Sequence, residues 1–207
     1  MPRDQADVNT SPAQPLQKSR TLVLTLATLF SLDAFAGGLI VQSLLALWLY
    51  HRFGLSLAAT GAIFFWSGVF SAASYLVAVR LSNRIGLVNT MVFTHLPSSV
   101  CLLLIPLVPD LATTIVLLLI RSALSQMDVP TRTSYVMAIV TPGERAAAAS
   151  VTAVPRSLAA ASSPLLAGWL MSVSSFGWPL VAAAALKIVY DLLLLFMFRK
   201  HRPPEER

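Results

Sequence analysis

The sequence contains six long apolar runs, and each is about as long as the roughly 20 residues that a helix needs to cross a lipid bilayer. The runs are continuous and do not alternate between polar and apolar residues, so they predict helices and not the strands of a membrane β-barrel. Only 12% of the residues are charged, against about 25% in an ordinary soluble domain, which argues against a soluble globular protein. We therefore predict an all-α membrane protein with six transmembrane helices. The predicted spans are residues 21–50, 57–80, 87–108, 111 to the 130s, 146–172 and 178–198.

Two polar segments flank the apolar region and define the predicted domain organisation. Residues 1–20 form an N-terminal tail, residues 21–198 the six-helix transmembrane domain, and residues 199–207 a C-terminal tail. With the N-terminus in the cytoplasm, eleven of the 15 Lys and Arg residues fall in cytoplasmic loops and tails, and only Arg52 falls outside. This asymmetry predicts that both termini are cytoplasmic and that the chain lies in the cell (inner) membrane. Residues 34–36 imitate a signal-peptide cleavage site, but Asp33 interrupts the apolar run before them, so we keep this run as the first span.

Five charged residues fall within the predicted spans, where a charge near the bilayer centre costs about 2.5–3.5 kcal/mol. Residues of this kind are functional hypotheses by default, with charge pairing as the structural alternative. Three of the five are positive and two are negative, so nearly all of them can pair. They are Asp33 in span one, Arg121 in span four, Arg156 in span five, and Lys187 and Asp191 in span six.

The roles of these charged residues allow more than one interpretation. Asp33 is either a cavity-facing carboxylate that binds a cation or carries a proton, or a structural partner for Arg121 or Arg156. Arg121 has a planar guanidinium that suits an anionic substrate, but pairing with Asp33 is favoured. Lys187 and Asp191 are four residues apart, which puts them on one helix face and predicts a local ion pair. The role of Arg156 is left open.

The end of span four and the middle of span one carry further signals. Asp128 and Arg132 are also four residues apart, and we expect them to gate or brace the cytoplasmic face. Gln126 can hydrogen-bond to a neighbouring helix. Gly37 and Gly38 follow Asp33 closely and allow that helix to bend or another helix to approach it. Span five is rich in Ala and Ser, which predicts close helix packing.

The sequence lacks the motifs of the common enzyme classes. It has no P-loop, no H-E-x-x-H and no G-x-S-x-G, so we expect no enzyme activity and no cofactor. Cys101 is the single cysteine, and His51, His95 and His201 are far apart in the sequence, so we predict no metal site. The basic residues lie mostly in loops and tails, where they set membrane orientation, and we expect no nucleic-acid partner.

Two groups of segments form a recognisable pattern. The first is RSALSQMDVPTR (121–132) with SYVMAIV (134–140) and PGER (142–145), and the second is LDAFAGG (32–38) with QSLL (42–45). Together they resemble the C-terminal six-helix half of a major facilitator superfamily transporter. The resemblance covers roughly residues 20–200. In the family's loop signature G-x-x-x-D-R-x-G-R-[RK], aligned with residues 79–88, only Arg84 and Gly86 match, which weakens a gating role for Arg84.

The resemblance implies two three-helix inverted repeats, with the first and fourth helices lining a central cavity. Asp33, Arg121 and Gln126 are then the candidate cavity residues that bind a substrate or ion. Span six is peripheral in that fold, so Lys187 and Asp191 are candidates for a structural charge pair, as are Asp128, Arg132, Arg156 and Arg84.

The resemblance also implies a function and a partner. The family usually has twelve helices, and alternating access requires two halves that rock about a central site. We therefore expect secondary active transport of a small solute across the bilayer, with proton coupling through Asp33 as one option, and a second six-helix half or a second copy as partner. The alternative is a truncated membrane scaffold that binds partner helices without transporting a solute.

Overall fold

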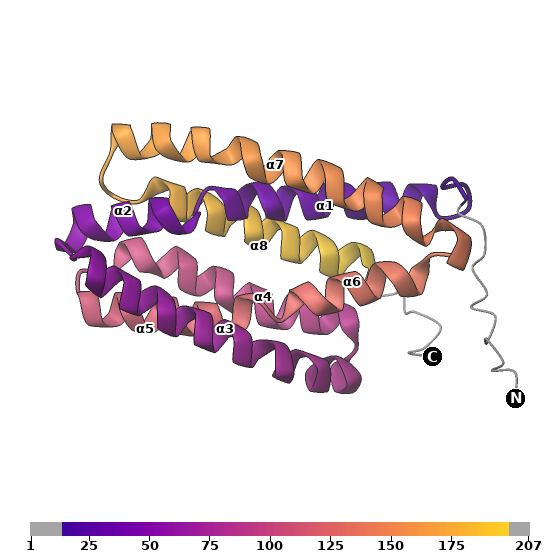
Figure 1. The fold of residues 1–207 in the computed structure, drawn as a ribbon, viewed down its shortest axis with the longest axis horizontal. Coiled ribbons are helices and arrows are strands. Elements are labelled where there is room, and N and C mark those ends of the chain that lie inside the picture. Colours follow the sequence, from indigo (N-terminus) through magenta and orange to yellow (C-terminus); the bar gives the residue numbers. More distant parts are fainter. Residues whose placement is uncertain (1–13, 199–207) are drawn as a thin grey trace, which may run out of the picture.

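The computed structural model describes residues 14–198, and all regular structure in that range is helical (Figure 1). Two spans consist of two helices each, one is extended by a short 3-10 helix, and another short 3-10 helix lies in a loop. The elements are α1 (Arg20–Gly38), α2 (Gln42–Phe53), α3 (Leu57–Ile85), α4 (Leu87–Leu104), η1 (Ile105–Leu107), α5 (Leu111–Ser125), α6 (Asp128–Ile139), η2 (Pro142–Glu144), α7 (Arg145–Val173) and α8 (Trp178–Phe198).

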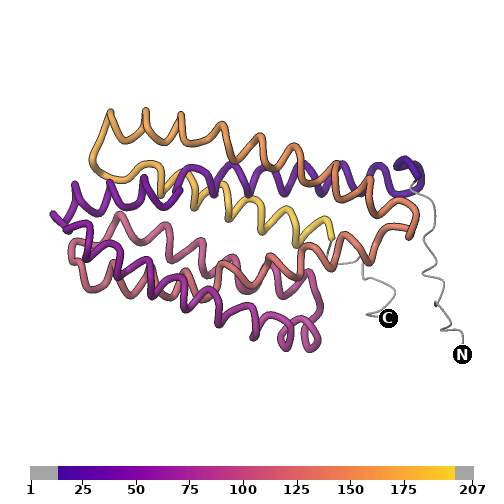
Figure 2. The backbone as a smooth tube through the Cα atoms, in the orientation of Figure 1, coloured from indigo at the N-terminus to yellow at the C-terminus, as the bar shows by residue number. Residues whose placement is uncertain are grey.

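The chain passes along the bundle six times, which agrees with the six predicted spans (Figure 2). Five of these passes are long and apolar enough to cross a membrane: 20–53, 57–85, 87–107, 111–139 and 178–198. The sixth, α7, has 29 residues and is long enough, but its many Ala and Ser residues make it less apolar. The predicted span 57–80 proves too short, because α3 continues to Ile85. The predicted tails fall largely on residues 1–13 and 199–207, which lie outside the described residues.

The first span is interrupted between α1 and α2, directly after Gly37 and Gly38. Gly38 faces α7 at very close range, because a Cβ atom built on it would lie 1.9 Å from the Ser163 side-chain oxygen and 2.5 Å from the Ala160 carbonyl oxygen. The small residues of α7 therefore let the two helices approach closely, as their composition predicts.

The fourth span is interrupted in a similar way between α5 and α6, at residues 126–127. Pro130 explains this break. It has no N–H to donate to the carbonyl of Gln126, and its ring collides with that carbonyl in a continuous helix. Instead the N–H of Val129 contacts the Gln126 oxygen at 3.4 Å, so the chain turns more tightly before α6 begins.

The packing of the helices follows an internal two-fold pattern. The first three passes are α1–α2, α3 and α4, and the last three are α5–α6, α7 and α8. The first pass of each set packs against the second pass of the other set: α1 packs along α7, and α5 and α6 pack along α3. The third passes of the two sets, α4 and α8, pack against each other. Because each set crosses the bundle three times, the second set starts from the opposite end. This is the arrangement of two inverted three-helix repeats.

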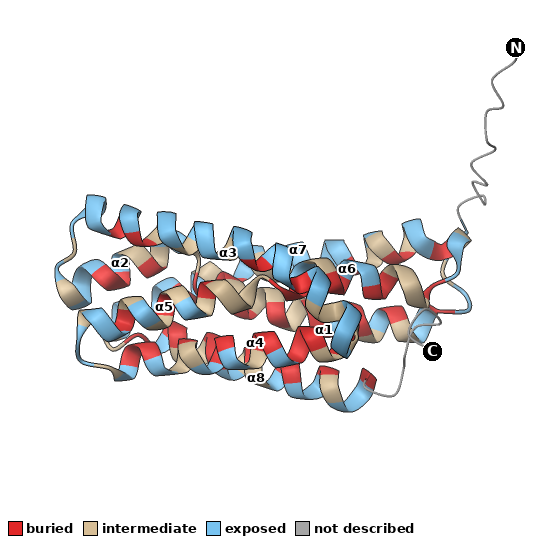
Figure 3. Cartoon of the chain, turned by 90° about the horizontal axis from the view of Figure 1, so that it is seen from below, coloured by how far each residue is buried: buried red, intermediate tan, exposed pale blue. Residues whose placement is uncertain are grey.

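Two apolar clusters fill the bundle, one toward each end. One contains Leu26 and Phe30 of α1, Val92 of α4 and Leu194 of α8, and the other contains Leu39, Leu102 and Leu180. Figure 3 shows that buried residues line the inner faces of α1, α4 and α8, while α3 and α7 keep long exposed faces. On α1, α4 and α8 the residues between the two clusters include charged side chains, so these charges lie near the middle of the bundle.

The segment before α1 is fixed to the loop between α6 and α7 by Glu144. Its carboxylate accepts hydrogen bonds from the backbone N–H groups of Gln17 at 2.7 Å, Lys18 at 2.9 Å and Ser19 at 3.3 Å. All three donors lie just before α1, which begins at Arg20, so the carboxylate holds this turn against the loop. The same hydrogen bonds lower the pKa of Glu144 to about 2 from its ordinary value of 4.5.

Replacing Glu144 with glutamine is expected to loosen residues 14–19 without disturbing the bundle. A neutral amide accepts these hydrogen bonds more weakly than a carboxylate. Because the pKa in the folded chain is lowered, the carboxylate stabilises this contact fully above the ordinary pKa and loses the effect as the pH falls toward 2. Hydrogen exchange of the Gln17, Lys18 and Ser19 amides measures this. Asp110→Gln, which changes an acidic cap at the start of α5, should leave these amides protected.

Candidate functional site

The centre of the bundle holds a network of buried charged side chains around Asp33 of α1. One carboxylate oxygen, Oδ1, accepts a hydrogen bond from Lys187 Nζ of α8 at 2.6 Å. The other, Oδ2, accepts one from the Arg132 guanidinium of α6 at 2.8 Å. All three residues are buried, with 7%, 8% and 6% of their surface exposed. Asp33 therefore links the first span to the fourth and the sixth.

Arg132 is held by several partners at once. Besides Asp33 it contacts the carboxylate of Asp128, one turn earlier on α6. Its guanidinium carbon also lies 4.8 Å from the centre of the Phe30 ring and 5.6 Å from that of Tyr190. A cation over an aromatic ring is attracted by the negative face of the ring, and the attraction is stronger away from water. These contacts fix the guanidinium beside Asp33.

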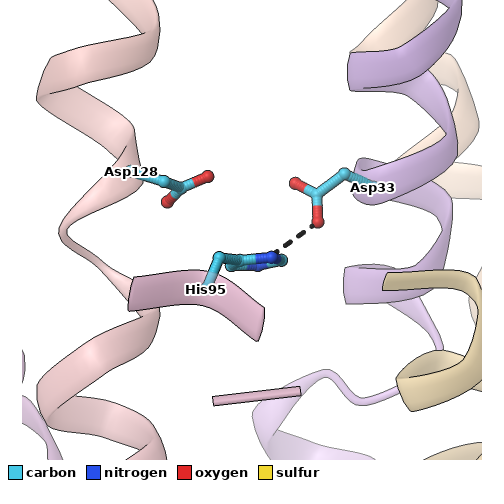
Figure 4. A group of neighbouring side chains, drawn as sticks. All are labelled: Asp33, His95 and Asp128. Carbon is cyan, nitrogen blue, oxygen red and sulfur yellow. Dashed lines mark ion pairs between the residues drawn. The ribbon is translucent and has the colours of Figure 1, made fainter. Parts of the chain in front are cut away.

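His95 adds α4 to the helices that contribute side chains to the network. Its Nδ1 atom lies 2.8 Å and 3.0 Å from the two carboxylate oxygens of Asp191 on α8. Its Nε2 atom lies 3.5 Å from Asp33 Oδ1 and 3.4 Å from Lys187 Nζ. The Tyr190 ring packs edge-on against the imidazole, with ring centres 5.8 Å apart. Figure 4 shows the imidazole lying between Asp33 and Asp128, with Nε2 directed at the Asp33 carboxylate.

Three of these residues lie close enough together to be tested as a metal site. Asp33, His95 and Asp128 each offer one ligand atom, and these atoms lie within 4.8 Å of one another. However, both carboxylates already contact a cationic side chain, Asp33 two of them and Asp128 one. A divalent cation at this place would face the charges of Arg132 and Lys187. The side chains present therefore fit a closed ion-pair network better than a metal site.

The network corrects two predicted ion pairs. Asp33 pairs with Lys187 and Arg132, and not with Arg121 or Arg156. Lys187 does not pair with Asp191 four residues later. Instead Lys187 reaches Asp33 on α1, and Asp191 reaches His95 on α4. Lys187 and Asp191 do share a helix face, as predicted. That face contacts both α1 and α4, and each of these helices provides a separate partner for one of the two charges.

The predicted pair between Asp128 and Arg132 is confirmed, although its surroundings differ from the expectation. Only 3% of Asp128 and 6% of Arg132 is exposed, because α6 packs against α4 and turns these side chains into the bundle. The pair therefore lies inside the bundle as part of the central network.

Four predicted site residues lie outside the network. Arg121 on α5 is half-buried, and within residues 14–198 its side chain makes no hydrogen bond or ion pair. Gln126, between α5 and α6, accepts a hydrogen bond from the Tyr75 hydroxyl of α3 at 3.2 Å. Arg156 is exposed on α7 and Arg84 is exposed near the end of α3.

His95 is the residue that sequence reasoning missed. The wide separation of the three histidines along the chain gives no sign of its role. One signal was available, since a histidine in the middle of an apolar span is an intramembrane ionisable residue like the other five. Its partners Asp33 and Asp191 are 62 and 96 residues away, and the packing of both α4 and α1 on α8 brings them together.

Two inverted sets of three spans, with charges from four spans meeting at mid-bundle, are the architecture of a secondary transporter. The chain belongs to the major facilitator superfamily, because the sequence model of that family matches residues 24–207. It is therefore a membrane transporter of this superfamily and an integral membrane protein, and members of this superfamily are transporters rather than enzymes. A search of curated proteins found no match.

Proposed function

We propose that the chain is one half of a secondary active carrier that moves a small solute by alternating access, driven by a proton gradient. The observation that supports this most directly is the buried network around Asp33, which joins α1, α4, α6 and α8 through ion pairs. Ion pairs have discrete partners, so a network of this kind offers alternative arrangements that a proton or solute can favour. We place the chain in the inner membrane with both termini on the cytoplasmic side and residues 21–198 as the transmembrane domain.

We assign solute contact to Arg121 and Gln126, and proton coupling to the Asp33 carboxylate. Arg121 is the best candidate for the solute itself. Its guanidinium is half-buried without a carboxylate partner in the described part of the chain, whereas the guanidinium of Arg132 already contacts the carboxylates of Asp33 and Asp128. A guanidinium of this kind can bind a carboxylate or phosphate with two parallel hydrogen bonds. Gln126 lies nearby in sequence and adds an amide next to the break in span four.

A partner half is needed to close the cavity from the other side, and we propose either a second six-helix chain or a second copy. The exposed faces of α3 and α7 support this proposal, since they carry large side chains such as Trp66 and Leu158. Arg156 supports it further. It is exposed near the middle of α7, where a charge facing lipid is unfavourable and a partner surface would shield it.

The test is uptake of small organic anions into proteoliposomes with an imposed proton gradient. We expect gradient-driven uptake that Arg121→Gln reduces by about 10-fold or more, because one charge-assisted hydrogen bond contributes roughly 1.5–3 kcal/mol. Arg52→Gln, which removes an exposed guanidinium at the end of α2, is the matched control and should transport normally. Uptake that persists without the gradient, or in Asp33→Asn with the gradient still driving it, removes the coupling role of Asp33.

Cross-linking in native membranes separates the carrier from the non-transporting scaffold. A cysteine in place of Leu158 on α7 should cross-link to a six-helix partner or to a second copy, and one in place of Phe196 on α8 should not. A chain that stays monomeric in this assay cannot perform alternating access, and that result removes the carrier proposal.

A further inference from the structure

Arg156 on α7 lies at the depth of the central charge network. Helices α1 and α7 pack side by side from the same end of the bundle, where Glu144 holds the segment before α1 (Figure 1). Further along, Gly38 of α1 lies against Ala160 of α7. Asp33 precedes Gly38 by five residues and Arg156 precedes Ala160 by four, so the two charged residues lie at about the same level. Arg156 is therefore near mid-bundle and not at either end, where lipid headgroups are found.

The guanidinium of Arg156 is exposed and has no partner within residues 14–198. No ion pair or side-chain hydrogen bond joins it to another described residue. Its large neighbours on α7, Val154 and Leu158, are apolar and exposed as well. A cation in apolar surroundings needs an opposite charge or water, so this position is unfavourable while the chain is alone in the bilayer.

Among the described residues, no carboxylate is free to pair with Arg156. Five acidic residues lie within residues 14–198, and the four others fall in the polar end segments of the sequence. Three of the five are buried in the central network, where each already contacts a lysine, arginine or histidine side chain: Asp33, Asp128 and Asp191. The remaining two, Asp110 at the start of α5 and Glu144 in the loop before α7, lie at the ends of the bundle.

A second copy of the chain has the same shortage of carboxylates on its exposed helices. Helices α3 and α7, which keep long exposed faces, contain four arginines and no acidic residue. An interface built on these helices would therefore bring only further positive charge to Arg156 from a second copy. Like charges at an interface repel one another, so this charge pattern disfavours a pair of identical chains and favours a partner of a different charge pattern.

We propose that Arg156 forms an ion pair with a carboxylate of a different chain, a six-helix half that presents an aspartate or glutamate at the depth of Asp33. This inference rests on the proposed function, which requires a second half, and it selects a non-identical half over a second copy. Each charge alone is unfavourable in apolar surroundings, whereas the two compensate each other when the halves associate. The pair therefore favours the assembled form over each half on its own.

A zero-length cross-link in native membranes tests the proposal. Arg156→Lys keeps the positive charge and introduces a primary amine, which an apolar carbodiimide joins to a neighbouring carboxylate as an amide with loss of water. We expect mass spectrometry to find position 156 linked to an aspartate or glutamate within an apolar segment of another chain. The unmodified chain, which carries a guanidinium there, is the matched control and should show no link at this position. Two copies of the chain with different tags, expressed together, should not purify together.

Arg156→Gln measures how much the ion pair contributes to association. Removing one member of a desolvated charge pair leaves the other without compensation, so we expect recovery of the partner found by the cross-link to fall about 10-fold or more. Arg52→Gln, which removes an exposed guanidinium at the end of α2, should leave the recovery unchanged. Equal recovery with Arg156→Gln and with the unmodified chain overturns the ion pair.

The outcomes distinguish this inference from the proposed function. A link between position 156 and a second copy, or joint purification of the two tagged copies, overturns the inference and leaves a carrier made of identical halves. No link at position 156, in a chain whose Leu158→Cys variant still cross-links to another six-helix protein, overturns the ion pair and leaves the partner half. A chain that cross-links to nothing at either position removes the carrier proposal together with the inference.

Discussion

Asp33→Asn is expected to lower the free energy of unfolding by about 3–5 kcal/mol, which is the usual cost of removing one partner from a buried ion pair. The carboxylate is the shared partner of Lys187 and Arg132, and all three residues are buried. An amide offers one oxygen without charge, so the ammonium of Lys187 stays buried without compensation. Titration of the purified chain in mixed micelles with a denaturing detergent measures the loss.

The double variant Asp33→Asn, Lys187→Met is the informative control. It removes the uncompensated ammonium together with its partner, so we expect it to recover a substantial part of the lost stability. Asp110→Asn removes a carboxylate outside the network and keeps the N-cap of α5, so it should change stability little. Equal stability of Asp33→Asn and the unmodified chain contradicts a closed ion-pair network.

Gly38→Ala is expected to destabilise the bundle by about 1–3 kcal/mol through overpacking, even though alanine forms helices better than glycine. The added methyl group would lie 1.9 Å from the Ser163 side-chain oxygen and 2.5 Å from the Ala160 carbonyl oxygen. The serine side chain can rotate away, but the backbone oxygen can retreat only if α7 moves as a whole. The same detergent titration measures the effect.

Gly37→Ala is the matched control, one residue earlier on the same helix. A Cβ atom there meets no atom within 4 Å, so the substitution should be neutral or stabilise the helix by roughly 0.5–1 kcal/mol. Equal effects of the two alanine substitutions contradict the close contact between α1 and α7.

Hydrophobicity alone predicted the six passes of the chain, because the length of an apolar run is a local property. The break after Gly37 and Gly38 could be anticipated from the glycine pair, and the contact between Asp128 and Arg132 from their spacing. The end of α3 could not be placed well. Its last turn carries Arg84 and polar neighbours, which resemble a loop, but it continues to Ile85 as a helix.

The partners of the buried charges could not be predicted from a single sequence. The spacing of Lys187 and Asp191 shows that they share a face of a helix, but it does not show which helices that face meets. Lys187 lies opposite α1 and Asp191 opposite α4, and an ion pair forms with the partner of best geometry rather than with the nearest in sequence. His95 was missed for the same reason, since its partners lie on helices far away along the chain.

The interruptions after Gly38 and before Asp128 fall in the first and fourth spans, the two that open each three-helix repeat. At both places the continuous series of helical backbone hydrogen bonds ends, so each span consists of two shorter helices separated by a break. The helices that follow the two breaks, α2 and α6, have 12 residues each. These two helices lie at opposite ends of the bundle, so each end contains one short helix that is joined to its longer neighbour without continuous helical hydrogen bonds.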